Sequence, residues 1–134
     1  MTTLPRAEPT LTELDRVRLQ ALPRRGIALP AALQDLLDNA DVVPSREVPA
    51  DVVTLYTRLQ LAESDARMRP LVVCQPEDAE PEAGFISVLS PLGTALLGHR
   101  AGDTVAWVTP DGHRHAARIA ALDFQPEASG DYVT

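Results

Sequence analysis

The sequence predicts an α+β protein, in which an N-terminal antiparallel hairpin of two short helices precedes an antiparallel sheet that carries one short helix. Three observations predict this class. Apolar residues recur three or four positions apart over residues 10–40, which is the period of a helix face. From residue 52 onward, short runs of strand-forming residues are separated by turn residues. Ser90-Pro91 then marks the start of one short helix between two of these runs.

The composition limits the classes of function. The chain of 134 residues is 45% hydrophobic but only 4% aromatic, which predicts an aliphatic core. A formal net charge of −7 argues against direct DNA binding, because phosphate binding depends on clustered positive charge. No apolar run approaches the roughly 18 residues of a membrane span, and the first residues lack the layout of a signal peptide. We therefore expect a cytoplasmic protein that does not insert in a membrane, and the sequence leaves its oligomeric state open.

The first helix of the hairpin is predicted to begin at Thr10. Two prolines disfavour a helix before it, so residues 1–9 are expected to be a flexible tail. The run Thr10 to Glu13 fits a capping box, in which the Thr10 hydroxyl accepts a hydrogen bond from the Glu13 backbone N–H. The apolar stripe of this helix is predicted to contain Leu11, Leu14, Val17, Ala21 and Leu22.

The second helix is predicted to open with Pro30 at its first position, where a missing N–H costs nothing. Each helix has about 11 to 13 residues, so the hairpin, a short coiled coil, extends roughly 16–20 Å. We assign residues 10–48 to the hairpin and 49–134 to a second domain. The stripe of the second helix is predicted to contain Leu33, Leu36, Leu37 and Ala40.

The tip of the hairpin carries Arg24 and Arg25. The simplest interpretation is that two exposed arginines keep the tip soluble. The alternative is that they bind acidic groups or RNA phosphate on a partner, because guanidinium groups pair well with both.

The second domain is predicted to contain five strands and one helix. An acidic loop over residues 76–84 supplies much of the negative charge. Asp111-Gly112 lies in a hairpin turn whose two central residues are both expected to have positive φ. The strands are predicted over residues 52–61, 68–75, 85–89, 104–109 and 113–124.

The short helix of this domain is predicted to start at a rigid corner. Ser90 is the N-cap, Pro91 takes the first helical position, and Gly98 ends the helix in the left-handed conformation. Corners of this kind often carry recognition. The alternative is that the corner only covers the open end of a small sheet.

Few residues suggest chemistry. His113 and His115 share one face of a strand, but two histidines alone do not complete a metal site. Cys74 lies in an apolar run and is expected to be a buried small hydrophobe, and Trp107 is expected in the core. The sequence has no glycine-rich phosphate loop and no nucleophile elbow. We therefore expect no catalytic residue, no metal and no cofactor.

Residues 86–105, ISVLSPLGTALLGHRAGDTV, resemble the signature of the C-terminal domain of the Gre transcript-cleavage factors. Residues 124–132, FQPEASGDY, narrow the resemblance to the Gre relatives known as regulators of nucleoside diphosphate kinase. The resemblance implies an FK506-binding-protein-like (FKBP-like) fold that docks on bacterial RNA polymerase at the rim of its secondary channel. On this resemblance, Ser90, Pro91 and Leu92 would contact the polymerase.

The resemblance also implies what the hairpin does. Gre factors need acidic side chains at the tip to help hold a magnesium ion, and here Arg24 and Arg25 stand there without an acid. We therefore expect a non-enzymatic regulator that occupies the channel, competes with Gre factors and alters nucleoside diphosphate kinase levels indirectly. The alternatives are an active transcript-cleavage factor and an FKBP-like prolyl isomerase, although fold alone does not confer that activity.

Overall fold

The computed structural model describes residues 9–63 and 67–130. The tail predicted over residues 1–9 lies outside this range, apart from Pro9. The helices are α1 (Glu13–Gln20), α2 (Ala31–Asn39) and α3 (Pro91–Leu96). Two strands flank the first two helices: β1 (Thr10–Thr12) and β2 (Asp41–Val43). The sheet contains β3 (Arg58–Ala62), β4 (Met68–Cys74), β5 (Phe85–Ser87), β6 (Thr104–Val108) and β7 (Arg114–Phe124).

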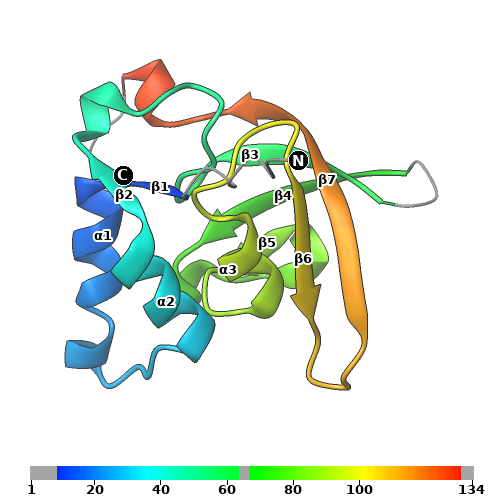
Figure 1. The fold of residues 1–134 in the computed structure, drawn as a ribbon, viewed down its shortest axis with the longest axis horizontal. Helices are drawn as coiled ribbons and strands as arrows, with labels where there is room; N and C mark the ends of the chain where they lie inside the picture. Colours follow the sequence, from blue (N-terminus) through cyan, green and yellow to red (C-terminus); the bar gives the residue numbers. More distant parts are fainter. Residues whose placement is uncertain (1–8, 64–66, 131–134) are drawn as a thin grey trace, which may run out of the picture.

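Figure 1 shows a mixed helix-and-sheet protein whose curled sheet holds α3 against one face, with α1 and α2 beside it. The strand order is β5-β4-β3-β7-β6, and only the β4–β5 pair is parallel. Five strands and one short helix were predicted for this part of the chain, and this prediction is confirmed. Strand β7 is much longer than β3, so the β6–β7 hairpin continues past the end of β3.

The capping box predicted at Thr10 is displaced by two residues. Residues 10–12 form β1, which pairs in parallel with β2, and the helix begins at Glu13. Thr12 is the N-cap: its hydroxyl oxygen accepts a hydrogen bond from the Asp15 backbone N–H at 3.0 Å. The prediction failed because Thr10 pairs with Asp41, 31 residues later in the sequence, and is therefore part of a strand rather than a helix cap.

The predicted stripe of the first helix is also wrong in part. Val17 is 60% exposed, whereas Asp15 and Leu19 are buried. The helix therefore turns an acidic residue toward the interior, which a pattern of apolar residues cannot indicate. The stripe of α2 is confirmed at Leu33 and Leu36, which are buried.

The two N-terminal helices are 8 and 9 residues long, shorter than predicted. Buried leucines from both belong to one cluster with residues of the sheet, such as Leu59 and Val73. The helices therefore lean on the sheet rather than standing apart from it. A coiled-coil hairpin is not confirmed and stays a prediction, as does the FKBP-like character of the sheet.

The first strand of the sheet begins later than predicted. Tyr56 has a φ of 70°, a left-handed conformation that breaks an extended strand. The Thr57 N–H donates to the Thr54 carbonyl oxygen at 3.0 Å and closes a turn around it. Val53 and Leu55 are nonetheless buried. The alternating pattern therefore predicted the burial of these side chains correctly, but not their backbone conformation.

The turn between β6 and β7 differs from the prediction in one residue. Gly112 has a φ of 85°, but Asp111 does not have positive φ. The Gly112 N–H donates to the Thr109 carbonyl at 2.8 Å, and the Thr109 N–H donates to the His113 carbonyl at 3.0 Å. This is a longer loop with glycine at the left-handed position, rather than a two-residue turn.

Candidate functional site

The corner that opens α3 has the predicted form. The Ser90 hydroxyl accepts a hydrogen bond from the Gly93 N–H at 3.0 Å and donates to the Ser87 carbonyl at 2.7 Å. Gly98 has a φ of 86°, as predicted. The Gly93 position permits no side chain, because an added Cβ would lie 2.1 Å from the Ser87 carbonyl oxygen. Strand β5 and helix α3 therefore meet at a rigid, closely packed corner.

The three residues predicted to contact a partner have different environments at this corner. Pro91 is exposed, Ser90 is half-buried with its hydroxyl occupied by the cap, and Leu92 is only 8% exposed. Pro91 is therefore the side chain that the corner presents, while Ser90 and Leu92 hold it in place.

Two cavities lie on either side of Pro91. A groove of about 580 Å³ runs between α2 and β6, and a concave pocket of about 770 Å³ lies between β5 and the β6–β7 hairpin. Pro91 and Trp107 line both. The corner predicted from sequence thus stands between these two hollows.

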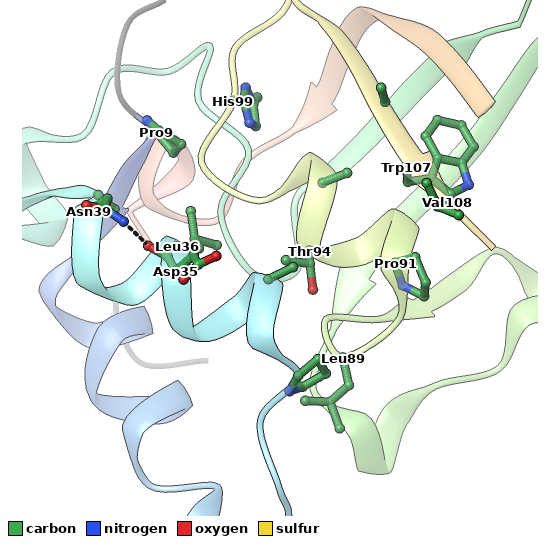
Figure 2. A pocket seen from close by; sticks show the side chains of 15 residues that line it. Pro9, Asp35, Leu36, Asn39, Leu89, Pro91, Thr94, His99, Trp107 and Val108 are labelled. Carbon is green, nitrogen blue, oxygen red and sulfur yellow. Dashed lines mark hydrogen bonds between the residues drawn. The ribbon is translucent and has the colours of Figure 1, made fainter. Parts of the chain in front are cut away.

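Figure 2 shows the groove from close by. Asp35, Leu36 and Asn39 of α2 form one side, and Trp107 and Val108 of β6 lie opposite, with α3 between them. The lining is mostly apolar, and Val108 is 52% exposed. The Asn39 side-chain amide donates to the Asp35 carbonyl at 2.8 Å, so it caps α2 rather than pointing at a ligand.

The concave pocket is lined by an aromatic stack. The rings of Trp107 and His115 lie directly opposite each other on β6 and β7, with centroids 5.4 Å apart and planes 14° from parallel. The His115 Nε2 lies 3.2 Å from the Thr109 hydroxyl, which orients the imidazole. The prediction that Trp107 belongs to the core is wrong in part, because the side chain is half-buried and lines both cavities.

Charged groups lie at the rim of this pocket. Arg69 forms an exposed ion pair with Glu63 at 3.5 Å. Arg114 makes no ion pair with any residue in the described ranges 9–63 and 67–130. Both arginines line the pocket, and Glu63 is the one acid among its described lining residues.

The predicted tip lies in a short turn, Pro23–Arg25, followed by Gly26 with a φ of 81°. Arg24 and Arg25 are both exposed. Arg25 pairs with Glu77 of the acidic loop at 3.2 Å. The tip therefore contacts the sheet part of the protein through an ion pair that the sequence did not indicate.

A buried polar cluster brings together Asp15, Thr54 and Glu127, and the sequence did not indicate it. Asp15 is fully buried, and its carboxylate accepts hydrogen bonds from the Leu55 N–H at 2.9 Å and from Arg18 at 3.1 Å. The Thr54 hydroxyl donates to the Glu127 carboxylate at 2.7 Å. Desolvation, opposed by the Leu55 hydrogen bond, raises the pKa of Asp15 from 3.8 to about 6, and the neighbouring Glu127 charge adds to the rise.

No metal centre accompanies these features. Within residues 9–63 and 67–130, no group of three or more His, Cys, Asp or Glu side chains is arranged to hold a metal ion. His113 pairs instead with Asp111 at 2.7 Å. Cys74 is buried, as predicted, and its thiol donates weakly to the Ile86 carbonyl at 3.6 Å. In the same described part of the chain, no helix has the length and apolarity to cross a bilayer.

The sequence and the fold both match known proteins. The sequence profile of the family described as "Transcription elongation factor, GreA/GreB, C-term" matches residues 48–123. The chain is 35% identical to the "Regulator of nucleoside diphosphate kinase" of Escherichia coli (strain K12), over 95% of this chain and 98% of that protein. It is 37% identical to "Transcription elongation factor GreA" of Clostridium botulinum, over 60% of this chain and 51% of that protein.

A solved structure supports the same relationship. The "Prokaryotic transcription elongation factor GreA/GreB from Nitrosomonas europaea" superposes with a TM-score of 0.72 at 30% identity, covering 87% of this chain and 98% of that one. The matched profile spans more than half of the chain and includes the whole corner at Ser90. The chain therefore belongs to the GreA/GreB family of transcription elongation factors.

Proposed function

We propose that this protein is a non-enzymatic regulator that binds bacterial RNA polymerase at the secondary channel and competes there with Gre factors. The observation that carries the proposal is the exposed Pro91 on a rigid corner inside the region that matches the GreA/GreB profile. Ser90 supports this surface by capping α3, and Leu92 supports it by packing its side chain into the interior. The FKBP-like sheet would form the docking body, and the two N-terminal helices would form the part that enters the channel.

The turn between these helices argues against transcript cleavage. Cleavage by metal assistance needs oxygen ligands for magnesium. Residues 23–28 contain two arginines and no acid, and Arg25 is engaged with Glu77 at 3.2 Å. Two guanidinium groups would repel a divalent cation. The protein would therefore occupy the channel without supplying the chemistry.

A role in regulating nucleoside diphosphate kinase, as in the name of the Escherichia coli relative, would follow indirectly from altered transcription.

Competition tests the proposal. A labelled Gre factor is bound to purified core RNA polymerase, and this protein is titrated in as the wild type and as Pro91→Asp. Aspartate suits the first position of a helix, so α3 should form while the exposed surface becomes charged. We expect displacement by the wild type and weaker displacement by the variant.

Pro44→Asp is the matched control, because Pro44 is also exposed and precedes a helical turn, in the connection between β2 and β3. It should displace as the wild type does. Failure of the wild type to displace the Gre factor would refute the proposal. Equal loss in both variants would refute the role of Pro91. Release of short 3′ RNA fragments from a stalled complex would instead revive the cleavage alternative.

A further inference from the structure

The concave pocket has an open aromatic platform. Strand β7 pairs with β3 only from Arg118 onward, whereas His115 lies three residues before that point. On one side the His115 ring stacks on Trp107, and on the other side no strand among the described residues 9–63 and 67–130 pairs with β7 at this point. His115 is exposed and lines the pocket. A planar ring can therefore extend the stack on the open face of the imidazole.

The geometry of the existing stack favours this extension. The two rings are already nearly parallel, and the Thr109 hydroxyl holds the imidazole at 3.2 Å. A third ring would meet a platform whose orientation is set before it arrives, so little entropy is lost in ordering it. Stacking of bases on aromatic side chains contributes to binding in many proteins that bind nucleic acids.

The charges of the pocket favour an anion beside that ring. Arg114 has no ion-pair partner within the described residues, and Arg69 is held only by an exposed pair at 3.5 Å. An exposed pair of this kind contributes little stability, so Arg69 can exchange its partner for a ligand. Among the described residues that line the pocket, there are two arginines and one acid, Glu63, in a chain whose net charge is −7. Positive charge is thus concentrated where the chain as a whole is negative.

Ile86, Pro91 and Leu92 form an apolar part of the remaining wall, which also contains Ser87 and Ser90. A volume of about 770 Å³ is in the range of small-molecule sites. A guanidinium group binds phosphate oxygens in a two-pronged geometry.

We propose that the concave pocket binds a purine nucleotide, with the base stacked on the Trp107–His115 pair and the phosphates held by Arg114 and Arg69. This site goes beyond the proposed function and does not depend on it. Because Pro91 borders the same pocket, a bound nucleotide would lie beside the surface proposed to dock on the polymerase.

The test uses the only tryptophan of the chain, Trp107, as a reporter. The full chain is titrated with ATP and GTP while tryptophan fluorescence is excited at the red edge of its absorption, and free N-acetyltryptophanamide corrects for absorbance by the nucleotide. We expect saturable quenching, with much weaker binding of the uncharged nucleosides adenosine and guanosine. Absence of saturation up to about 5 mM would overturn the proposal, because such a site would retain little more than 3 kcal/mol of binding free energy.

Two arginine variants separate a site from general attraction. Arg114→Gln should weaken binding about tenfold, the effect of losing a charge-assisted hydrogen bond. Arg118→Gln is the matched control, since Arg118 is an exposed arginine of the same strand and does not line the pocket. It should bind as the wild type does. Equal weakening by both variants would show non-specific attraction and would overturn the assignment to the concave pocket. Circular dichroism confirms that both variants are folded.

Discussion

Asp15 in the first turn of α1 accepts a hydrogen bond from the backbone N–H of Leu55 at 2.9 Å, across 40 residues of sequence. The carboxylate is fully buried, and Arg18 is its only cationic hydrogen-bond partner within the described chain. The bond attaches the first helix to the segment that leads into β3. It also places an ionisable group where burial disfavours its charge.

The first prediction concerns pH. Burial raises the pKa of Asp15 from 3.8 to about 6. Between these two values the folded protein keeps the Asp15 proton while the unfolded chain releases it, so folding takes up a proton. The contribution of Asp15 to stability is therefore complete below about pH 4 and is lost as the pH rises through 6, by roughly 3 kcal/mol.

Asp15→Asn isolates this effect, because asparagine does not titrate but can still accept the Leu55 hydrogen bond. Urea unfolding at about pH 4 and about pH 7 should show Asp15→Asn gaining on the wild type by roughly 3 kcal/mol at the higher pH. Asp35→Asn, which changes an exposed acid on α2, should follow the wild type at both. A pH-independent difference for Asp15→Asn would contradict the prediction.

The second prediction concerns the start of α1. Thr12→Val removes the hydroxyl that caps the Asp15 N–H at 3.0 Å, and it should lower the free energy of unfolding by about 1 kcal/mol. Thr10→Val should cost much less, because Thr10 lies in β1 and valine suits a strand. Urea titrations of both variants measure these losses in the free energy of unfolding. A larger loss for Thr10→Val than for Thr12→Val would indicate that Thr10, and not Thr12, is the N-cap.

The third prediction concerns Gly93. An alanine Cβ there would lie 2.1 Å from the Ser87 carbonyl oxygen and 3.0 Å from the Val88 Cα. Both are backbone atoms, which cannot rotate away, so Gly93→Ala should cost more than about 3 kcal/mol. Gly102→Ala is the comparison: its φ is +96° but an added Cβ meets nothing within 4 Å, so it should cost about 1–2 kcal/mol. Similar costs in thermal unfolding would argue against a close contact at the corner.

The fourth prediction concerns Cys74. Desolvation, with the nearby charges of Asp78 and Glu77, raises the pKa of this buried thiol to about 11. The native protein should therefore react with a disulfide reagent only as fast as it opens, and at once in denaturant. Introducing a second thiol by Ala50→Cys, at an exposed position, should give one fast and one slow reaction. Two fast reactions in the native state would show that Cys74 is accessible.

Local chemistry explains why the corner at Ser90 was predictable. A cap, a proline at the first helical position and a following glycine lie within nine residues of one another, and each acts on its own neighbours. The stripe of α2 was equally local. Nothing beyond the segment itself was needed to place Ser90, Pro91 and Leu92.

The start of α1 was not predictable in this way. Thr10 to Glu13 and Thr12 to Asp15 both fit the spacing of a capping box. The pairing of β1 with β2 selects the second, and that pairing depends on residues after the second helix. The burial of Asp15 likewise depends on Leu55, and the aromatic stack depends on the register between Trp107 and His115. Each is a contact between segments that are distant in the sequence, and the local pattern of residues does not predict such contacts.

The ladder between β1 and β2 has a consequence for how such proteins diversify. It brings the residue before α1 next to the residue after α2, with Thr10 paired to Asp41. The segment between these two strands, which contains α1 and α2, is thus a helical arm. The β1–β2 ladder closes the base of this arm, whatever the length of the arm. Whole helical turns added near the distal loop at Gly26, where an added side chain would meet nothing within 4 Å, would lengthen the reach of the arm while leaving its base unchanged. Proteins with a short helical segment and proteins with a long one can in this way share the same sheet and the same α3.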